Sequence, residues 1–187
     1  MPLEWELLWE TYVRTCQKWQ IEPSHHAIFV SLGQQILWRV RDGQLMATYP
    51  VSFSRKPVSC TANSEGTPWG LHAVAEKHGD GAAPGTVFIG RVPQGLYWER
   101  DDYGPDQPAY VATRILWLTG LEPGLNQGGN CDTYKRYVYI HGTVHPERFP
   151  QRDSSGCLLL RDDDLIALFD ATPVGTHVLI DRYGVDE

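Results

Sequence analysis

Short apolar runs separated by turn residues fill this chain from Pro23 onward, and they limit the possible folds more than any other feature. The runs are rich in Val, Ile, Leu, Phe and Tyr, and Asp42-Gly43 between two of them is typical of a tight β-hairpin. The predicted strands cover residues 27–32, 35–40, 44–53, 71–75, 86–89, 95–99, 110–118, 136–140 and 177–181. The sequence therefore predicts a mainly β fold, with an antiparallel meander at 27–53 and a curled sheet or sandwich around the core.

Two segments have helical periodicity instead. Between residues 3 and 20, apolar side chains recur every three or four positions, which predicts an amphipathic helix packed on the sheet. Residues 162–171 predict a short helix whose first turn is capped by an aspartate and whose end is followed by Pro173. The glycine-rich loop 120–133 either borders a functional site or is a surface excursion.

Length and composition restrict the kind of protein. A chain of 187 residues suffices for one ordinary hydrophobic core, so we expect a single domain, 1–187, with a helix at 1–22 packed on a β-rich part at 27–181. The net charge of −7 and the lack of any Lys/Arg cluster argue against nucleic acid as a partner. No apolar run approaches the length of a membrane span.

The N-terminal residues and the cysteines give few further clues. Acidic residues interrupt the first turns, so no secretory signal peptide is visible; the chain is cytosolic, is exported by another route, or is not the primary translation product. The four cysteines form no C-x-x-C pair, and no histidines have metal-ligand spacing, so we expect no metal. Cys16, Cys60 and Cys131 are expected to be small buried hydrophobes.

One histidine and one cysteine suggest nucleophilic chemistry. His141 ends a predicted strand, and Cys157 directly follows Gly156. A cysteine thiol is mostly protonated at neutral pH, so a catalytic cysteine needs a nearby imidazole to hold its thiolate. The backbone N–H groups of Gly156 and Cys157 are candidate donors to an oxyanion. From spacing alone, the alternative remains open that Cys157 is a core residue and His141 a surface histidine.

The residues around this pair resemble a known family. The strings Ile140-His141-Gly142-Thr143 and Ser154-Ser155-Gly156-Cys157 are similar to the signature of the L,D-transpeptidase catalytic domain, also called the YkuD domain. Three further elements match in order, namely residues 34–52, the Thr-Pro-x-Gly element at 66–70 and the turn at 173–180. The resemblance covers residues 27–181.

This resemblance implies an enzyme that acts on the stem peptides of bacterial peptidoglycan in the cell envelope, is inhibited by carbapenems and needs no cofactor. It implies that Cys157 attacks a stem-peptide carbonyl to form a thioester, while His141 moves the protons and the Gly142 carbonyl orients the imidazole. An amine of a neighbouring stem then resolves the thioester into a cross-link. Gly156 would supply a backbone donor to the oxyanion.

The chain departs from the family pattern beside the nucleophile. The family usually has Ser/Thr-His-Gly-Cys, an apolar residue and then Arg or Asn, whereas this chain has Ser155 for the second histidine and Leu159 at the Arg/Asn position. These changes remove polar groups that contact a substrate carboxylate or steady a thiolate. Candidate substrate-binding residues are Ser154, Ser155, Tyr139, His72 and Arg161. Arg161 is included because, in an extended segment, it points the same way as Leu159 and compensates for it.

Three functions are compatible with this altered motif. The first is an L,D-transpeptidase, with a subclass that joins L-alanine of one stem to diaminopimelate of the next as a specific hypothesis. The second is an L,D-carboxypeptidase or amidase, in which water hydrolyses the same thioester. The third is a non-catalytic module that binds peptidoglycan.

Overall fold

The computed structural model describes residues 5–102 and 110–185, and strands dominate it. The helices are α1 (Trp5–Trp19) and α2 (Asp162–Asp170), with short 3-10 turns at Tyr97–Glu99 and Gly129–Cys131. The strands are β1 (His26–Ser31), β2 (Ile36–Arg41), β3 (Gln44–Pro50), β4 (Gly70–His78), β5 (Thr86–Ile89), β6 (Val92–Leu96), β7 (Val111–Gly120), β8 (Tyr139–Gly142), β9 (Leu158–Leu160) and β10 (His177–Asp181). The prediction of a mainly β fold with one helix near each end is confirmed.

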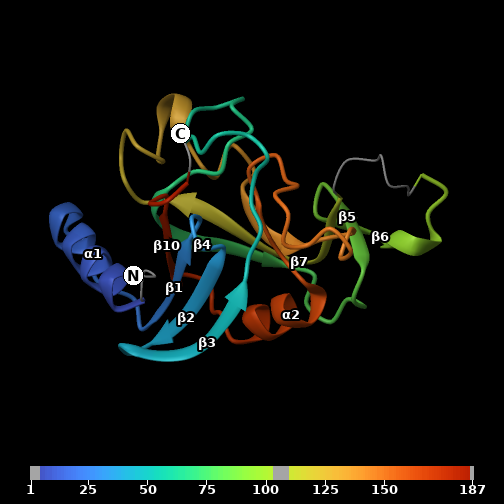
Figure 1. Ribbon diagram of the computed structural model, residues 1–187, viewed down its shortest axis with the longest axis horizontal. Coiled ribbons are helices and arrows are strands. Elements are labelled where there is room, and N and C mark those ends of the chain that lie inside the picture. Colours follow the sequence, from blue (N-terminus) through green and yellow to red (C-terminus); the bar gives the residue numbers. More distant parts are fainter. Residues whose placement is uncertain (1–4, 103–109, 186–187) are drawn as a thin grey trace.

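These strands join in one mixed sheet (Figure 1). Its main path runs in the order β3-β2-β1-β10-β4-β7-β5-β6, and β8 pairs with β7 and with β9 beside that path. The meander β1-β2-β3 is antiparallel, as predicted. Two pairs are parallel, β1 with β10 and β8 with β9. The β5-β6 hairpin projects from the body on the side away from α1 (Figure 1).

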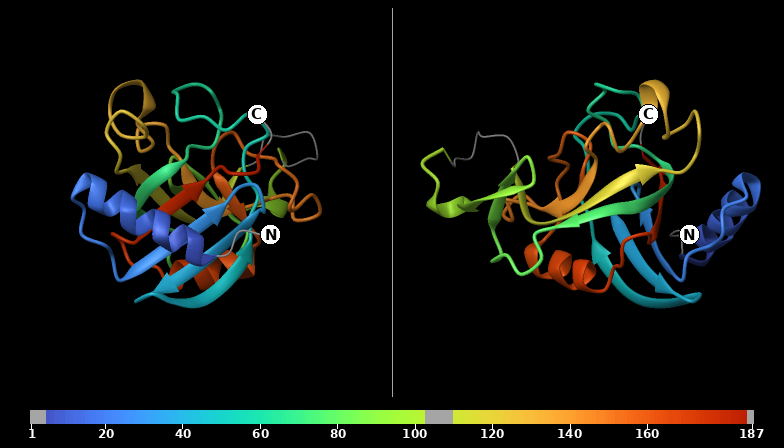
Figure 2. Two further views of the ribbon diagram at one scale, coloured as in Figure 1. Left: turned by 60° about the vertical axis from the view of Figure 1, so that its left-hand side comes forward. Right: turned by 180° about the vertical axis from the view of Figure 1, so that it is seen from behind.

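The two helices cover opposite faces of this sheet, and the alternation of side chains along each strand shows why. In β1, Ala27 and Phe29 pack with Leu8 and Tyr12 of α1. The neighbouring side chains of Ile28 and Val30 pack on the other face, in the core that contains Leu165, Leu168 and Phe169 of α2. Figure 2 shows α1 lying across the strands and α2 on a different side. Both faces of the central strands are therefore buried.

Several local predictions need correction. The predicted strand at 136–140 begins at Tyr139 instead, because Tyr137 has a positive φ of 56°, which breaks an extended backbone. Residues 95–99 divide between the end of β6 and a 3-10 turn, and the short strand at 71–75 extends over all of β4. The strand β9 was not predicted. The cap of α2 is the backbone of Arg161, without a side-chain bond, because the Asp162 carboxylate accepts a hydrogen bond from Thr113 Oγ1 at 2.5 Å.

Candidate active site

The parallel pair β8-β9 brings the two motif strings together. His141 is paired in register with Leu159, and Gly142 with Leu160, so Cys157 directly precedes the paired segment. Gly142 allows this close packing, because a Cβ there would lie 2.9 Å from the Ala112 carbonyl oxygen and 2.9 Å from Asp162 Oδ1. The strand pairing therefore brings a histidine in β8 and the cysteine just before β9 to one place.

His141 is held in one orientation and one tautomer. Its side chain is buried, and its Nδ1–H donates to the Gly142 carbonyl oxygen at 2.8 Å. Since a carbonyl oxygen only accepts, Nδ1 carries the proton and Nε2 keeps its lone pair. Burial lowers the pKa of His141 to about 4. At neutral pH the imidazole is uncharged and its Nε2 can accept a proton.

The Cys157 sulfur lies between two backbone groups of the chain that leads into β8. The Tyr139 N–H donates to Sγ at 3.3 Å, and the thiol donates to the Tyr137 carbonyl oxygen at 3.6 Å. Surrounding protein raises the pKa of the thiol to about 11, although the residue as a whole stays partly exposed. Together with the pKa of His141, this gives a neutral thiol beside a neutral imidazole, which differs from the expected preformed thiolate.

A tight turn positions the cysteine. The Ser154 hydroxyl donates to the Cys157 carbonyl oxygen at 2.6 Å, and the Gly156 N–H points at Ser154 Oγ at 3.4 Å. Gly156 has a φ of 122°, which suits glycine and strains other residues. The Ser154 side chain, which bridges this turn, is buried. The role of the Gly156 N–H toward an oxyanion stays a prediction.

His141 and Cys157 line the same cavity, which has a volume of about 130 Å³. Its walls are completed by Arg55, Val111, Asp153, Ser154 and Ser155. Leu159 is buried on the strand next to His141, where the family pattern would place a polar side chain. The apolar neighbour contributes no charge to the imidazole, which agrees with burial as the main cause of its low pKa.

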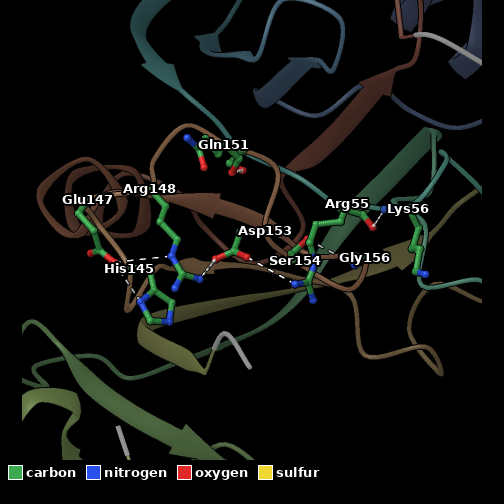
Figure 3. A network of polar contacts seen from close by, with 11 residues as sticks. Arg55, Lys56, His145, Glu147, Arg148, Gln151, Asp153, Ser154 and Gly156 are labelled. Atoms are coloured by element: carbon green, nitrogen blue, oxygen red, sulfur yellow. Dashed lines mark hydrogen bonds and ion pairs between the residues drawn. The ribbon is translucent and has the colours of Figure 1, made fainter. Parts of the chain in front are cut away.

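Arg55 and Asp153 in the wall of this cavity belong to a network of ion pairs, which Figure 3 shows. Asp153 lies between two arginines, with Oδ1 3.8 Å from Arg55 Nη1 and Oδ2 3.7 Å from Arg148 Nη1. Arg148 also approaches Glu147, and Glu147 contacts His145 Nδ1 at 3.2 Å. The positive charge of Arg55 is therefore partly compensated by a carboxylate that has only 14% of its side-chain surface exposed.

Two of the predicted substrate-binding residues lie elsewhere. His72 is fully buried, donates from Nδ1 to the Gly70 carbonyl oxygen at 2.9 Å and has Nε2 3.1 Å from Thr133 Oγ1. A groove-facing role for His72 is wrong because both ring nitrogens are used inside the protein. Arg161 keeps an extended backbone as the N-cap of α2, but its guanidinium packs over the Phe149 ring at 5.2 Å and the residue does not line the Cys157 cavity. It therefore does not replace the polar group missing at Leu159.

Tyr139 and Ser155 do lie beside the pair. The rings of Tyr139 and His141 are 6.5 Å apart, and the Tyr139 hydroxyl accepts a hydrogen bond from Arg91 Nη1 at 3.2 Å. Ser155 is exposed and lines the Cys157 cavity. The tyrosine packs with Phe88, Ile115 and Trp117 in a third apolar cluster, against which Cys157 lies.

A second cavity of about 460 Å³ adjoins the first and shares Ser155 with it. Gly129 and Asp132 line this second cavity, so the loop 120–133 borders it and not the cavity of His141 and Cys157. Arg136 also lines it. Sequence reasoning missed Arg136, Arg55 and Asp153, because their positions depend on contacts between distant segments, for which the local sequence carries no signal.

The remaining predictions concern the other cysteines, metal sites and membrane-spanning helices. Cys16 and Cys60 are buried as predicted, whereas Cys131 is partly exposed. Within residues 5–102 and 110–185, no group of three or more His, Cys, Asp or Glu side chains is arranged to hold a metal ion. None of the helices in that same part of the chain is long and apolar enough to cross a membrane.

Comparisons with known proteins show the family of this chain. The family model for the L,D-transpeptidase catalytic domain, YkuD, matches residues 25–180. A curated relative from Fuscovulum blasticum, described as a putative L,D-transpeptidase in the ATP synthase subunits region, is 25% identical over 174 residues. That alignment covers 93% of this chain and 68% of the relative.

Solved structures resemble the fold. L,D-transpeptidase 3 from Mycobacterium tuberculosis, in complex with a faropenem-derived adduct, matches with a TM-score of 0.52 and 16% identity, covering 84% of this chain and 60% of that one. The L,D-transpeptidase LdtMt1, in complex with imipenem, matches with a TM-score of 0.50 and 18% identity, covering 84% of this chain and 59% of that one. This chain thus spans about three fifths of the length of these solved chains.

Proposed function

Because this chain belongs to the L,D-transpeptidase catalytic domain (YkuD) family, we propose that it cross-links peptidoglycan stem peptides through a thioester on Cys157. The observation that carries this proposal is the shared cavity. His141 and Cys157 line this cavity together, and the hydrogen bond of His141 Nδ1 to the Gly142 carbonyl oxygen leaves Nε2 as the nitrogen that can accept a proton. A general base and a nucleophile are thus confined together.

In the first half of the proposed reaction, the neutral Cys157 thiol and the neutral His141 imidazole form the thioester. When a donor stem enters, the Cys157 thiol proton passes to His141 Nε2 as sulfur attacks the carbonyl carbon at the L-centre of the stem residue. The tetrahedral intermediate collapses with cleavage of the C–N bond. The leaving amine takes the proton from the imidazolium, and a thioester remains on Cys157.

The second half reverses these proton transfers. The amine of an acceptor stem attacks the thioester carbonyl carbon and gives a proton to His141 Nε2. The C–S bond then breaks, the sulfur regains that proton, and the new amide is the cross-link. If water replaces the amine, the same steps release a carboxylic acid, which is the L,D-carboxypeptidase outcome.

The altered motif favours a particular cross-link. Ser155 and Leu159 replace groups that flank the nucleophile in most of the family, and Ser155 lines the Cys157 cavity while Leu159 pairs with His141. A branch of the family that joins L-alanine of one stem to diaminopimelate of the next resembles this chain in departing from the usual motif at such positions, so we propose that cross-link as the product. Because the substrate lies in the cell envelope, the protein is expected to act there.

Muropeptide mass spectrometry tests this function directly. Purified protein and the Cys157→Ala variant are incubated with the same muropeptides. The wild-type protein is expected to yield dimers joined through L-alanine and diaminopimelate, and the variant none. Dimers joined only through two diaminopimelates would reject the cross-link type, shortened monomers without dimers would indicate hydrolysis, and identical products from both proteins would refute the nucleophile.

A further inference from the structure

Arg136 is held in an unusual way for a charged side chain. It is partly buried, and its guanidinium donates to three neutral acceptors. Nη1 donates to the Ser59 carbonyl oxygen at 3.1 Å, and Nη2 donates to the Gly66 carbonyl oxygen at 2.7 Å and to Ser64 Oγ at 3.3 Å. These bonds fix the plane of the guanidinium but leave its charge uncompensated.

Arg55 and Arg136 differ in whether a carboxylate compensates their charge. Arg55 lines the Cys157 cavity, and its charge is opposed by Asp153. Arg136 makes no ion pair with any carboxylate in the described part of the chain. A partly desolvated positive charge without a counter-ion is costly unless a ligand supplies the negative charge.

The surroundings of Arg136 fit a small anionic group. The side chain lines the cavity of about 460 Å³ that meets the Cys157 cavity at Ser155. Lys135, also in its wall, is exposed. Of the two acidic residues in the wall, Asp132 already accepts backbone N–H groups from Lys135 at 3.0 Å and Gly128 at 2.9 Å, and Glu65 is exposed.

Arg136 is also coupled to the nucleophile. Gly66, which accepts one of its hydrogen bonds, lies against the cysteine turn, since a Cβ on Gly156 would be 3.3 Å from the Gly66 carbonyl oxygen. The positive charge of Arg136 lowers the pKa of the Cys157 thiol, against the larger effect of burial. The guanidinium thus lies close enough to act on whatever occupies the space next to the sulfur.

We propose that the cavity lined by Arg136 is a carboxylate subsite, in which its fixed guanidinium binds a stem-peptide carboxylate and so replaces the polar group that Leu159 lacks. This assignment rests on the proposed function. The carboxylate comes either from the side-chain end of diaminopimelate or from the C-terminal D-residue. After its three donations to the protein, the guanidinium keeps the Nε–H and one Nη1–H, so it can give a charge-assisted hydrogen bond to a carboxylate from either source.

Amidated peptides test the subsite without altering the arginine. Binding of a stem tetrapeptide to the Cys157→Ala protein is measured by calorimetry at low salt. Two further peptides carry an amide in place of the diaminopimelate side-chain carboxylate or the C-terminal carboxylate. One of these two is expected to bind about tenfold more weakly than the parent, since it loses a charge-assisted hydrogen bond. Equal binding of all three peptides would overturn the subsite while leaving the proposed function intact.

Two arginine variants in the same Cys157→Ala background locate the charge. Arg136→Gln is expected to bind the acid and the discriminating amide within about twofold of each other, whereas Arg55→Gln keeps the preference of about tenfold. Arg136→Lys, which keeps the charge and loses the fixed planar guanidinium, is expected to retain part of the preference, and thermal unfolding shows that each variant is folded. A preference that survives Arg136→Gln or disappears in Arg55→Gln overturns the assignment. If no peptide binds at all, the failure lies with the proposed function, and the subsite falls with it.

Discussion

Two buried histidines, His141 and His72, have almost the same electrostatics and different surroundings. Each donates from Nδ1 to a nearby backbone carbonyl oxygen, at 2.8 Å to Gly142 and at 2.9 Å to Gly70. Burial lowers the pKa of each to about 4. The difference is at Nε2. His72 Nε2 meets Thr133 Oγ1 at 3.1 Å, whereas His141 lines a cavity together with Cys157.

A shifted pKa therefore does not single out the histidine that we propose to be catalytic. Both shifts have the same main cause, which is desolvation of the imidazolium. What separates the two residues is the cavity that His141 lines together with Cys157. Substitution of each histidine in turn tests this difference between His141 and His72.

The largest expected effect comes from His141→Gln. The variant lacks the group that accepts the thiol proton, so the rate of thioester formation on a stem tetrapeptide should fall by about 10³-fold. The rate is measured by intact-protein mass spectrometry in single-turnover experiments. The unfolding free energy is the control and should change little, because glutamine keeps an amide donor for the Gly142 carbonyl oxygen. A rate within tenfold of wild type would remove His141 from the mechanism.

His72→Ala should show the opposite pattern. Loss of a fully buried ring leaves a cavity, and the Gly70 carbonyl oxygen and Thr133 Oγ1 lose their hydrogen-bond partner. Together these changes should lower the unfolding free energy by about 2–4 kcal/mol. Thioester formation by the folded variant should stay within about threefold of wild type, since His72 contacts no reacting group. Denaturant unfolding measures the first quantity. A His72→Ala variant that is stable but inactive would show that His72 acts in the reaction.

A smaller effect appears as a dependence of stability on pH. A histidine with a pKa near 4 in the folded state and near 6.5 in the unfolded state binds its proton mainly after unfolding, so stability is lost as pH falls from 6.5 toward 4. Each such histidine should remove about 2 kcal/mol between pH 7 and pH 5. His72→Ala should lose less stability across this interval than wild type, by about that amount. Parallel pH profiles for the two proteins would contradict the buried neutral state of His72.

Much of the fold was predictable from local patterns. The meander and the N-terminal helix follow from period-two and period-3.6 spacing, because hairpins and amphipathic helices depend on neighbouring residues. Parallel pairing was not predictable in this way. Leu158–Leu160 is too short a run to indicate a strand, and it becomes one through its partner β8, whose paired residues lie eighteen positions earlier in the chain.

In the candidate site, too, the residues in local sequence strings were predictable and those that depend on distant contacts were not. Family resemblance identified His141, Cys157 and the Gly142 carbonyl, all of which lie in two short strings of sequence. It did not identify Arg136, because the acceptors that hold its guanidinium belong to residues 59–66. The backbone at Arg161 is extended, as the prediction assumed, but its guanidinium packs over the Phe149 ring, a contact between distant segments that the local sequence does not indicate.

The most direct test of Cys157 as the nucleophile is trapping with a carbapenem. Intact mass and peptide mapping are recorded after incubation of the wild-type, Cys157→Ala and Cys131→Ala proteins with imipenem. The account predicts one adduct, located on Cys157, that is absent from Cys157→Ala and unchanged in Cys131→Ala. An unmodified wild-type protein that still binds peptidoglycan would instead identify a non-catalytic binding module, and an adduct on Cys131 would show that the nucleophile has been misassigned.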